Sequence, residues 1–161
     1  MAVEMKLKGL MIDPVSEMPI IILTDPAGDQ VLPIWVGVFE ANAIAMQLEK
    51  ITPPRPFTHD LLRDIITGLD AKVTRVVITD LQENTFYAFI HMDHGGQDRR
   101  IDSRPSDAIA LALRTGAPIL VDPIVLEKSS ATGEDAVSDE AERLRKWLET
   151  VDPEELGKYE M

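Results

Sequence analysis

The sequence predicts an α+β fold: a single compact domain with mixed and antiparallel sheets, followed by a C-terminal amphipathic helix. Three observations support this class. Short β-branched runs bounded by turn residues alternate with segments of helical periodicity over residues 1–126. A pattern of three strands followed by a helix occurs twice, which indicates an internal β-β-β-α duplication. Hydrophobic residues make up 45% and charged residues 27% of the chain, as in ordinary soluble domains.

The first half begins with three expected strands. Apolar and polar residues alternate over 5–13, a β-branched run fills 19–25, and a third strand is expected over 31–36, where Pro33 favours a sheet edge or a bulge. Residues 38–50, VFEANAIAMQLEK, place apolar side chains at helical spacing.

A proline-rich loop, ITPPRPF, separates this helix from the next one. Thr58 has the residue type of a helix N-cap, and Asp60 would then lie in the first turn, where the helix dipole favours an acid. We therefore expect a second helix from Thr58 to about Leu69.

The second half repeats the first in its order of elements. Strands are expected over 71–81 and 84–93, joined by a hairpin turn, and a third over 99–103. The helix that follows is predicted to end at Gly116, with Pro118 just beyond, before a short strand over 118–122. Both helices at the ends of the repeats are apolar around most of their circumference, which predicts that they are buried.

The last part of the chain differs in composition. Residues 127–137 are typical of a flexible linker, and residues 138–161 comprise a helix capped by Ser138 and a short acidic tail. One side of that helix carries an apolar stripe, which needs a surface on this domain or on a second subunit: Leu144, Trp147, Leu148 and Val151.

Composition excludes several classes of function. The absence of cysteine excludes disulfides, thiolate metal sites and a cysteine nucleophile. No segment has the length and apolarity of a membrane span, and the N-terminus does not have the pattern of a signal peptide, so we expect a cytoplasmic protein that does not bind membranes.

Charge argues against strong non-specific binding to nucleic acids. The net charge is −12; residues 1–128 hold 18 acidic and 12 basic residues, and residues 129–161 hold 10 acidic and 4 basic ones. Half of the excess negative charge therefore lies in the last fifth of the chain, which weakens this objection without removing it.

None of the common catalytic motifs is present, whether GxSxG, HExxH, a P-loop or GxGxxG. His91 and His94 resemble a metal-binding pair. On a strand, however, side chains three residues apart lie on opposite faces, so we do not expect them to share a metal ion.

The better candidates lie where helices begin. Asp102 and Arg104 end one strand and are expected to point to the same face, while Asp107 lies in the first turn of the helix that follows. Arg55, His59 and Asp60 cluster at another helix start, and Glu40 and Asn42 lie at a third. If these starts converge, acids, arginines and a histidine surround one opening.

Such a set of residues suits metal-assisted hydrolysis of phosphodiesters. Carboxylates bind Mg²⁺ or Mn²⁺, arginine stabilises phosphoryl charge, and histidine transfers protons near neutral pH. The alternative is structural: acids in first turns stabilise helix dipoles by about 0.3–1 kcal/mol, Pro105 and Ser106 suit a helix start, and the arginines can pair with the acids.

Four ordered segments resemble the bifunctional nuclease domain family: LPIWVGVFEANAIAMQLEK, PRPFTHDLL, NTFYAFIHM and IDSRPSDAIALALRTGAPI. The resemblance covers about residues 5–126. It implies a compact α+β fold with mixed sheets, a homodimer, and the DNase and RNase activity for which the plant members are named. The motif positions that it carries over are Arg55, His59, Asp60, Asp102, Arg104, Ser106 and Asp107.

Two hypotheses follow. The first is a Mg²⁺- or Mn²⁺-dependent nuclease that acts on DNA and RNA. In it Asp102, Asp107 and Asp60 bind the metal and act in catalysis with His59, while Arg55, Arg104 and Ser106 bind substrate. The second is a non-catalytic dimeric module that binds a protein partner or a small anionic ligand; its Arg and Asp pairs hold helix ends together.

Overall fold

The computed structural model describes residues 1–131, and the helix expected over 138–151 lies outside these residues. The described chain folds into seven strands and four helices: β1 (Val3–Ile12), β2 (Pro19–Thr24), β3 (Val31–Trp35), α1 (Val38–Leu48), α2 (Thr58–Gly68), β4 (Ala71–Gln82), β5 (Thr85–His94), β6 (Gln97–Ser103), α3 (Pro105–Thr115), β7 (Ile119–Val121) and α4 (Pro123–Ala131). The predicted α+β class is confirmed, and the predicted order of elements matches from β1 to β7, whereas α4 was not predicted.

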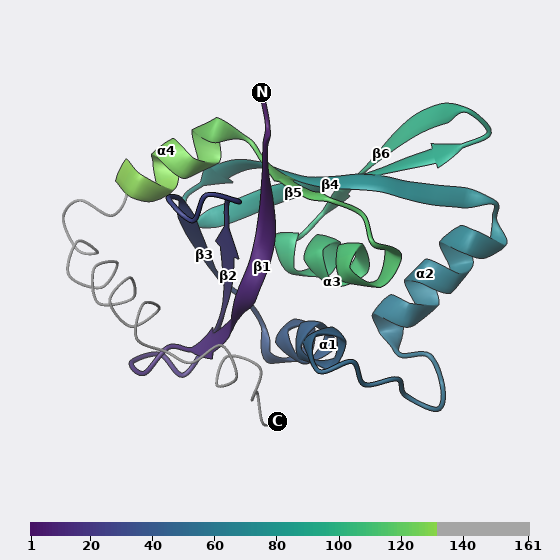
Figure 1. Ribbon diagram of the computed structural model, residues 1–161, viewed down its shortest axis with the longest axis horizontal. Coiled ribbons are helices and arrows are strands. Elements are labelled where there is room, and N and C mark those ends of the chain that lie inside the picture. Colours follow the sequence, from purple (N-terminus) through teal and green to yellow (C-terminus); the bar gives the residue numbers. More distant parts are fainter. Residues whose placement is uncertain (132–161) are drawn as a thin grey trace.

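All seven strands belong to one mixed sheet with the order β3-β2-β1-β7-β4-β5-β6. The short strand β7 lies at its centre, where it pairs parallel to β4 and antiparallel to β1; every other neighbouring pair is antiparallel. The two three-stranded meanders therefore lie on either side of β7, the arrangement that a duplication predicts. The sheet turns strongly between them, so that β1 and β4 run in very different directions (Figure 1).

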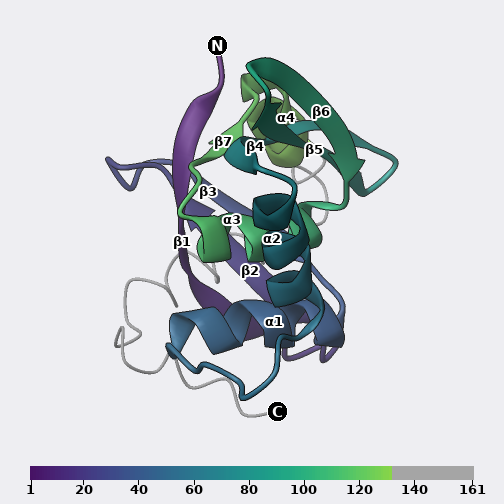
Figure 2. The same ribbon diagram turned by 90° about the vertical axis from the view of Figure 1, so that its right-hand side faces the viewer.

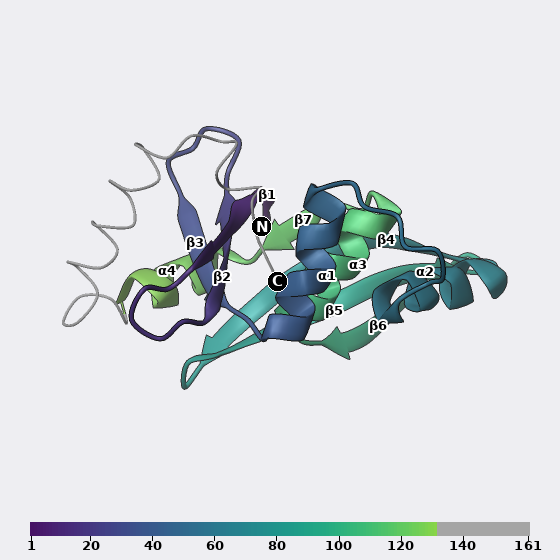
Figure 3. The same cartoon turned by 90° about the horizontal axis from the view of Figure 1, so that it is seen from below.

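Helices α1 and α3, which end the two repeats, pack side by side (Figure 3). Both helices bury short side chains, among them Ala41, Ala45, Ala108 and Ala112. Alanine lets two helices approach closely, and larger residues such as Ile44 and Ile109 fill the core around them. Helix α2 packs against α3, so the beginnings or flanks of three helices meet in one region (Figure 2).

Several local predictions are confirmed. Pro33 lies in β3, which is an edge strand. Gly116 ends α3 with a φ of 74°, a left-handed conformation that glycine adopts without a Cβ penalty. The hairpin between β4 and β5 turns at Glu83 and Asn84, both with positive φ.

Two boundaries differ from the sequence prediction. Thr58 is the first residue of α2 rather than its N-cap, a position that Phe57 occupies. The carboxylate of Asp60, at position N3, accepts a hydrogen bond from the Phe57 N–H at 3.0 Å, which is the half of a capping box that the N3 side chain supplies. Residues 127–131, expected to begin a linker, belong to α4, where Val125 is buried against the core.

Among the described residues, no helix is both long and apolar enough to cross a membrane.

Candidate active site

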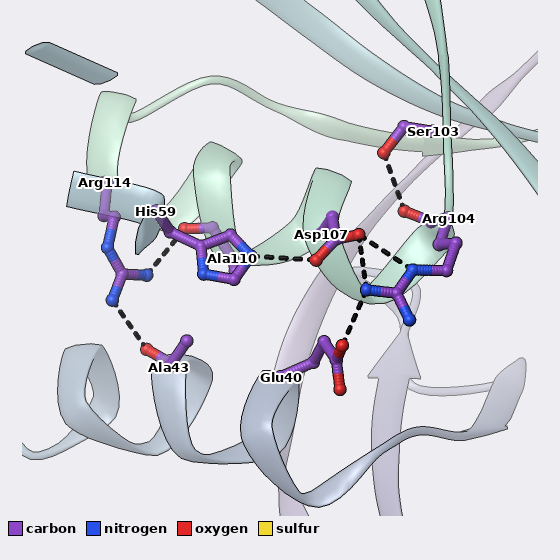
Figure 4. Close-up of polar contacts among 8 residues, drawn as sticks. All are labelled: Glu40, Ala43, His59, Ser103, Arg104, Asp107, Ala110 and Arg114. Carbon is purple, nitrogen blue, oxygen red and sulfur yellow. Dashed lines mark hydrogen bonds and ion pairs between the residues drawn. The ribbon is translucent and has the colours of Figure 1, made fainter. Parts of the chain in front are cut away.

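Four polar side chains at the starts of three helices form a continuous chain of ion pairs and hydrogen bonds (Figure 4). Glu40 lies in the first turn of α1, His59 in the first turn of α2, and Asp107 in the first turn of α3, which Arg104 precedes as the N-cap residue. We call Glu40, Arg104, Asp107 and His59 the ionic cluster. The predicted convergence of helix starts is therefore correct for these residues.

Asp107 is the centre of the ionic cluster. Its Oδ1 lies 2.9 Å from Nε2 of His59. Its Oδ2 accepts a hydrogen bond from Nε of Arg104 at 2.9 Å and forms an ion pair with Nη2 of Arg104, also at 2.9 Å. An ionised carboxylate only accepts hydrogen bonds, so the proton of a neutral His59 ring resides on Nε2. Asp107 thus fixes the tautomer of His59 and leaves Nδ1 as the basic nitrogen.

Arg104 joins the two carboxylates of the ionic cluster. Besides Asp107, it donates from Nη2 to Oε1 of Glu40 at 2.6 Å. The hydrogen bonds to Glu40 and then to Asp107 raise the pKa of the guanidinium above its usual value. The Arg104 side chain nevertheless remains 65% exposed, whereas that of His59 is only 10% exposed. The positive charge is thus held in a fixed position and is open to solvent.

Gly37 leaves room for the Glu40 carboxylate. It occupies the N-cap position of α1, and a Cβ added there would overlap Oε2 of Glu40. The backbone φ of Gly37 is −71°, which any residue can adopt, so space rather than conformation calls for glycine here.

Asp60 belongs to a separate, closed ion pair. Its Oδ1 accepts a hydrogen bond from Nε of Arg114 at 2.7 Å, and its Oδ2 is occupied by the Phe57 N–H. Burial alone would raise the pKa of Asp60, but the hydrogen bonds from Phe57 and Arg114 and the charge of Arg114 more than offset it and hold the pKa below its usual value. Asp60 therefore lies beside the ionic cluster and is not part of it.

Asp102 points away from the ionic cluster. It pairs across the sheet with Phe89, and cross-strand partners project from the same face. Ala88, next to Phe89 in β5, is buried in the core, so Phe89 projects from the opposite, outer face of the sheet. There the Arg100 guanidinium lies 4.3 Å from the centroid of the Phe89 ring. The expectation that Asp102 and Arg104 share a face is wrong, because β6 ends at Ser103 and Arg104 turns into the helix cap.

The two remaining predicted substrate-binding residues lie apart from this chain of contacts. Arg55 is exposed in the proline-rich loop, and it forms no ion pair or hydrogen bond within residues 1–131. Ser106 is only 6% exposed at the start of α3, and its hydroxyl group forms no hydrogen bond within residues 1–131.

The predicted metal ligands do not form a metal site in this arrangement. Both oxygens of Asp107 and both oxygens of Asp60 bind protein donors, and Asp102 lies on the outer face of the sheet. No group of three His, Asp or Glu side chains in the described part of the chain is placed to hold a metal ion. The donor set does not fit the expected Mg²⁺ or Mn²⁺.

Of the two other histidines, His91 has partners of its own. Its Nδ1 lies 3.1 Å from Nη2 of Arg75 and 3.4 Å from Oδ2 of Asp98. These contacts join β4, β5 and β6, and they do not include His94.

Sequence reasoning missed Arg114 altogether. Its signal is visible in retrospect: Arg114 directly follows the apolar run from Ala108 to Leu113, so its side chain had to be buried and required a partner. Glu40 was recognised as a helix-start residue, but its link to Arg104 spans 64 positions and leaves no local pattern.

Comparisons with known proteins identify one family and several relatives. A family model described as the bifunctional nuclease domain matches residues 21–134. Two uncharacterized proteins from Mycobacterium tuberculosis are 38% identical over 162 residues, which covers 95% of this chain and 97% of each relative. Bifunctional nuclease 1 from Oryza sativa subsp. japonica is 27% identical over 105 residues; the alignment covers 63% of this chain and 32% of the plant protein.

Proposed function

The chain belongs to the bifunctional nuclease domain family, and on that premise we propose that it is a nuclease that hydrolyses phosphodiester bonds in DNA and RNA. The observation that carries this proposal is the ionic cluster, in which Asp107 lies between a histidine that it orients and an arginine that solvent can reach. The names of the plant relatives support the same activity.

Each residue of the ionic cluster has a distinct proposed role. Arg104 binds a phosphoryl oxygen of the substrate, because its guanidinium is exposed and fixed by two carboxylates. Nδ1 of His59 accepts a proton from the attacking water. The water oxygen then bonds to phosphorus, the bond to the leaving oxygen breaks, and that oxygen takes a proton from solvent. Asp107 holds the His59 ring and stabilises its positive charge.

Dependence on Mg²⁺ or Mn²⁺ stays a prediction. A divalent cation would supply charge neutralisation at the phosphate. We assign no ligands to it, because the carboxylates expected to bind it are engaged by protein donors.

Cleavage assays on matched variants test this proposal. Wild type, Asp107→Asn and His59→Gln are purified identically and incubated with single-stranded DNA and with RNA in Mn²⁺, Mg²⁺ or EDTA. Loss of the general base is expected to slow cleavage by about 10²–10⁴-fold in both variants. Asp102→Asn is the matched control, because Asp102 lies five residues from Asp107 and outside the ionic cluster, and it should cleave like wild type.

Two outcomes would reject the assignment. Equal activity in Asp107→Asn, His59→Gln and wild type would show that the activity does not arise at this site. Loss of activity in Asp102→Asn alone would move the site to the outer face of the sheet. The EDTA arm decides separately whether a divalent cation is required.

The second candidate is a non-catalytic dimeric module for a protein partner or a small anionic ligand, and one observation favours it. Asp60 and Asp107 are both paired with cations, as expected if these side chains merely hold helix ends together. Under this alternative the ionic cluster is structural, and no variant of it would affect nucleic-acid cleavage.

We also propose that the protein is a homodimer, with helix α2 at the interface. The buried residues of α2 are the polar His59 and Asp60, whereas three apolar side chains spaced four residues apart face solvent: Leu61 (50% exposed), Ile65 (50%) and Leu69 (64%). An antiparallel pair of α2 helices about a two-fold axis would set Leu61 against the partner's Leu69 and cover this stripe.

Sedimentation velocity tests the dimer. Ile65→Glu should shift the protein toward monomer without unfolding it, because Ile65 is half-exposed in the single chain. Val15→Glu is the control, since Val15 is also exposed but lies in the turn between β1 and β2. An unchanged sedimentation coefficient in Ile65→Glu would exclude α2 as the interface. The expected cytoplasmic location is a separate prediction, which fractionation of the native host would test.

A further inference from the structure

Two phenylalanines with exposed rings accompany the ionic cluster. Phe39 precedes Glu40 in the first turn of α1, and its side chain is 86% exposed. Phe57 holds the N-cap position of α2, two residues before His59, and it is 49% exposed. Each ring therefore belongs to the same helix start as a member of the ionic cluster.

Folding does not account for the position of Phe39. Helix α1 buries Ala41, Ile44 and Ala45 against the rest of the domain, while Phe39 lies outside this packing. Burying a phenylalanine side chain is worth about 1.5–3 kcal/mol, so leaving it in water forgoes most of that gain. Of the described aromatic residues, none is more exposed. Phe39 directly precedes Glu40, the carboxylate that binds Arg104, so its exposed ring belongs to the same helical turn as a member of the ionic cluster.

The charge of the chain makes an apolar contribution necessary for binding nucleic acid. Residues 1–128 hold 18 acidic and 12 basic residues, so the general electrostatic field opposes the approach of a polyanion. Arg104 provides one fixed cation, and phosphate contacts alone cannot supply the usual electrostatic affinity. Stacking of a base on an aromatic ring contributes about 1–3 kcal/mol per base and does not depend on net charge.

We propose that Phe39 is a stacking platform for an unpaired base of single-stranded RNA or DNA whose phosphate lies at Arg104. The inference rests on the proposed nuclease function and names its substrate class. The base faces of a duplex are covered by their neighbours, so a duplex cannot stack on Phe39 without being opened. The site therefore selects single strands, and Phe57 offers a second, smaller apolar surface on the side of His59.

Binding by the full chain tests the proposal independently of cleavage. Fluorescence anisotropy is recorded in EDTA at low salt with a labelled oligothymidylate of about ten nucleotides, and with an abasic strand of the same length. Phe39→Ala should weaken binding of the oligothymidylate by about 5–150-fold, the equivalent of about 1–3 kcal/mol. Its binding of the abasic strand should equal that of wild type, since no base is present to stack.

Two further variants sharpen the test. Phe39→Trp should retain affinity, and its added indole fluorescence should be quenched when oligothymidylate binds. Tyr87→Ala is the matched control, because Tyr87 is an exposed aromatic residue (42%) on β5, outside the ionic cluster, and binding should be unchanged.

The proposal is overturned if Phe39→Ala binds both strands with wild-type affinity. It is also overturned if the substitution weakens binding of the abasic strand as much as binding of oligothymidylate. It is also overturned if Phe39→Ala instead changes the sedimentation coefficient, because Phe39 would then serve a protein interface. Phe39-dependent binding by a wild type that cleaves neither DNA nor RNA would reject the nuclease function and leave the stacking site standing. If Phe39→Ala instead cleaves and binds like wild type, the stacking site is rejected and the nuclease function is kept.

Discussion

The two ends of helix α3 carry two ion pairs of opposite character. At its start, Asp107 binds His59 and Arg104, and the Arg104 side chain is 65% exposed. Toward its end, Arg114 binds Asp60, and these side chains are 1% and 7% exposed. Both ion pairs connect α3 to α2, and both reach α1, through Glu40 in the first case and through the Ala43 carbonyl in the second.

The two ion pairs differ in how many nitrogens of the arginine donate hydrogen bonds. Each nitrogen of the Arg114 guanidinium donates a hydrogen bond: Nε to Asp60, Nη1 to the Ala110 carbonyl and Nη2 to the Ala43 carbonyl. Arg104 uses Nε and Nη2, and its Nη1 makes no hydrogen bond within residues 1–131. A buried cation must be fully paired, whereas an exposed one retains capacity for a ligand. The buried Arg114–Asp60 pair is therefore suited to holding three helices together, and the exposed Arg104–Asp107 pair to binding a ligand.

The largest expected effect is on stability at the buried end. Arg114→Met removes one partner of a buried pair and leaves the Asp60 charge uncompensated, which should lower the free energy of unfolding by about 3–5 kcal/mol. Arg104→Met, the same substitution at the exposed end of the same helix, should lower it by less than about 1 kcal/mol. Urea denaturation of both variants measures the difference, and equal losses would contradict the distinction between the two ends.

A smaller effect is expected from Asp60→Asn, and it depends on pH. The pKa of Asp60 in the folded protein is held below the ordinary value of 3.8, so its charge stabilises the fold above that pH. At neutral pH the substitution should cost about 1.5–3 kcal/mol, because a hydrogen bond to a charged group is weakened.

The lowered pKa of Asp60 determines how the stability difference between wild type and Asp60→Asn changes with pH. As the pH falls below 3.8 toward the folded pKa, wild-type Asp60 becomes protonated, and the difference between the two proteins should shrink. Urea denaturation at a series of pH values measures it. A difference that already shrinks above pH 3.8 would contradict the lowered pKa.

The smallest expected change in stability is at Gly37. Gly37→Ala displaces the Glu40 carboxylate from Arg104 but is compatible with the backbone, so the free energy of unfolding should change by less than about 1 kcal/mol. Cleavage should fall by roughly ten- to a hundredfold, as in Glu40→Gln, because the guanidinium loses one of its two supports. Gly68→Ala is the control, since a Cβ there meets no neighbouring atom, and it should cleave like wild type.

The fold was largely predictable because its signals are local. The alternation in β1, the turn residues Glu83 and Asn84, and Gly116 after α3 each act within a few positions. Helix α4 is not predictable from its composition, because Glu127, Lys128 and the two serines that follow have the composition of a linker. Helix formation there depends on the packing of Val125 and on the ion pair between Lys128 and Asp80. The same ion pair, together with hydrogen bonds from Gln82 and Leu81, lowers the pKa of Asp80 to about 2.

The sequence predicts most residues of the candidate site, but it does not predict which of them contact one another. Asp107, Arg104 and His59 were selected because they lie at helix starts, and they do meet. Asp102 was grouped with them on strand alternation, which fails where β6 ends and the chain turns into α3. Asp60 was grouped with them as an acid in a first turn, but its direction is set by Arg114, which sequence reasoning did not consider.

The sequence by itself determined the α+β class, the order of strands and helices, and the short list of polar residues at helix starts, because periodicity, turns and caps depend on neighbouring residues. Only the tertiary structure decided which of those residues touch. The link from Glu40 to Arg104 spans 64 positions and that from His59 to Asp107 spans 48, and contacts of this kind depend on how the helices pack. Packing likewise decided that Arg114 is buried and that Arg104 stays open to solvent.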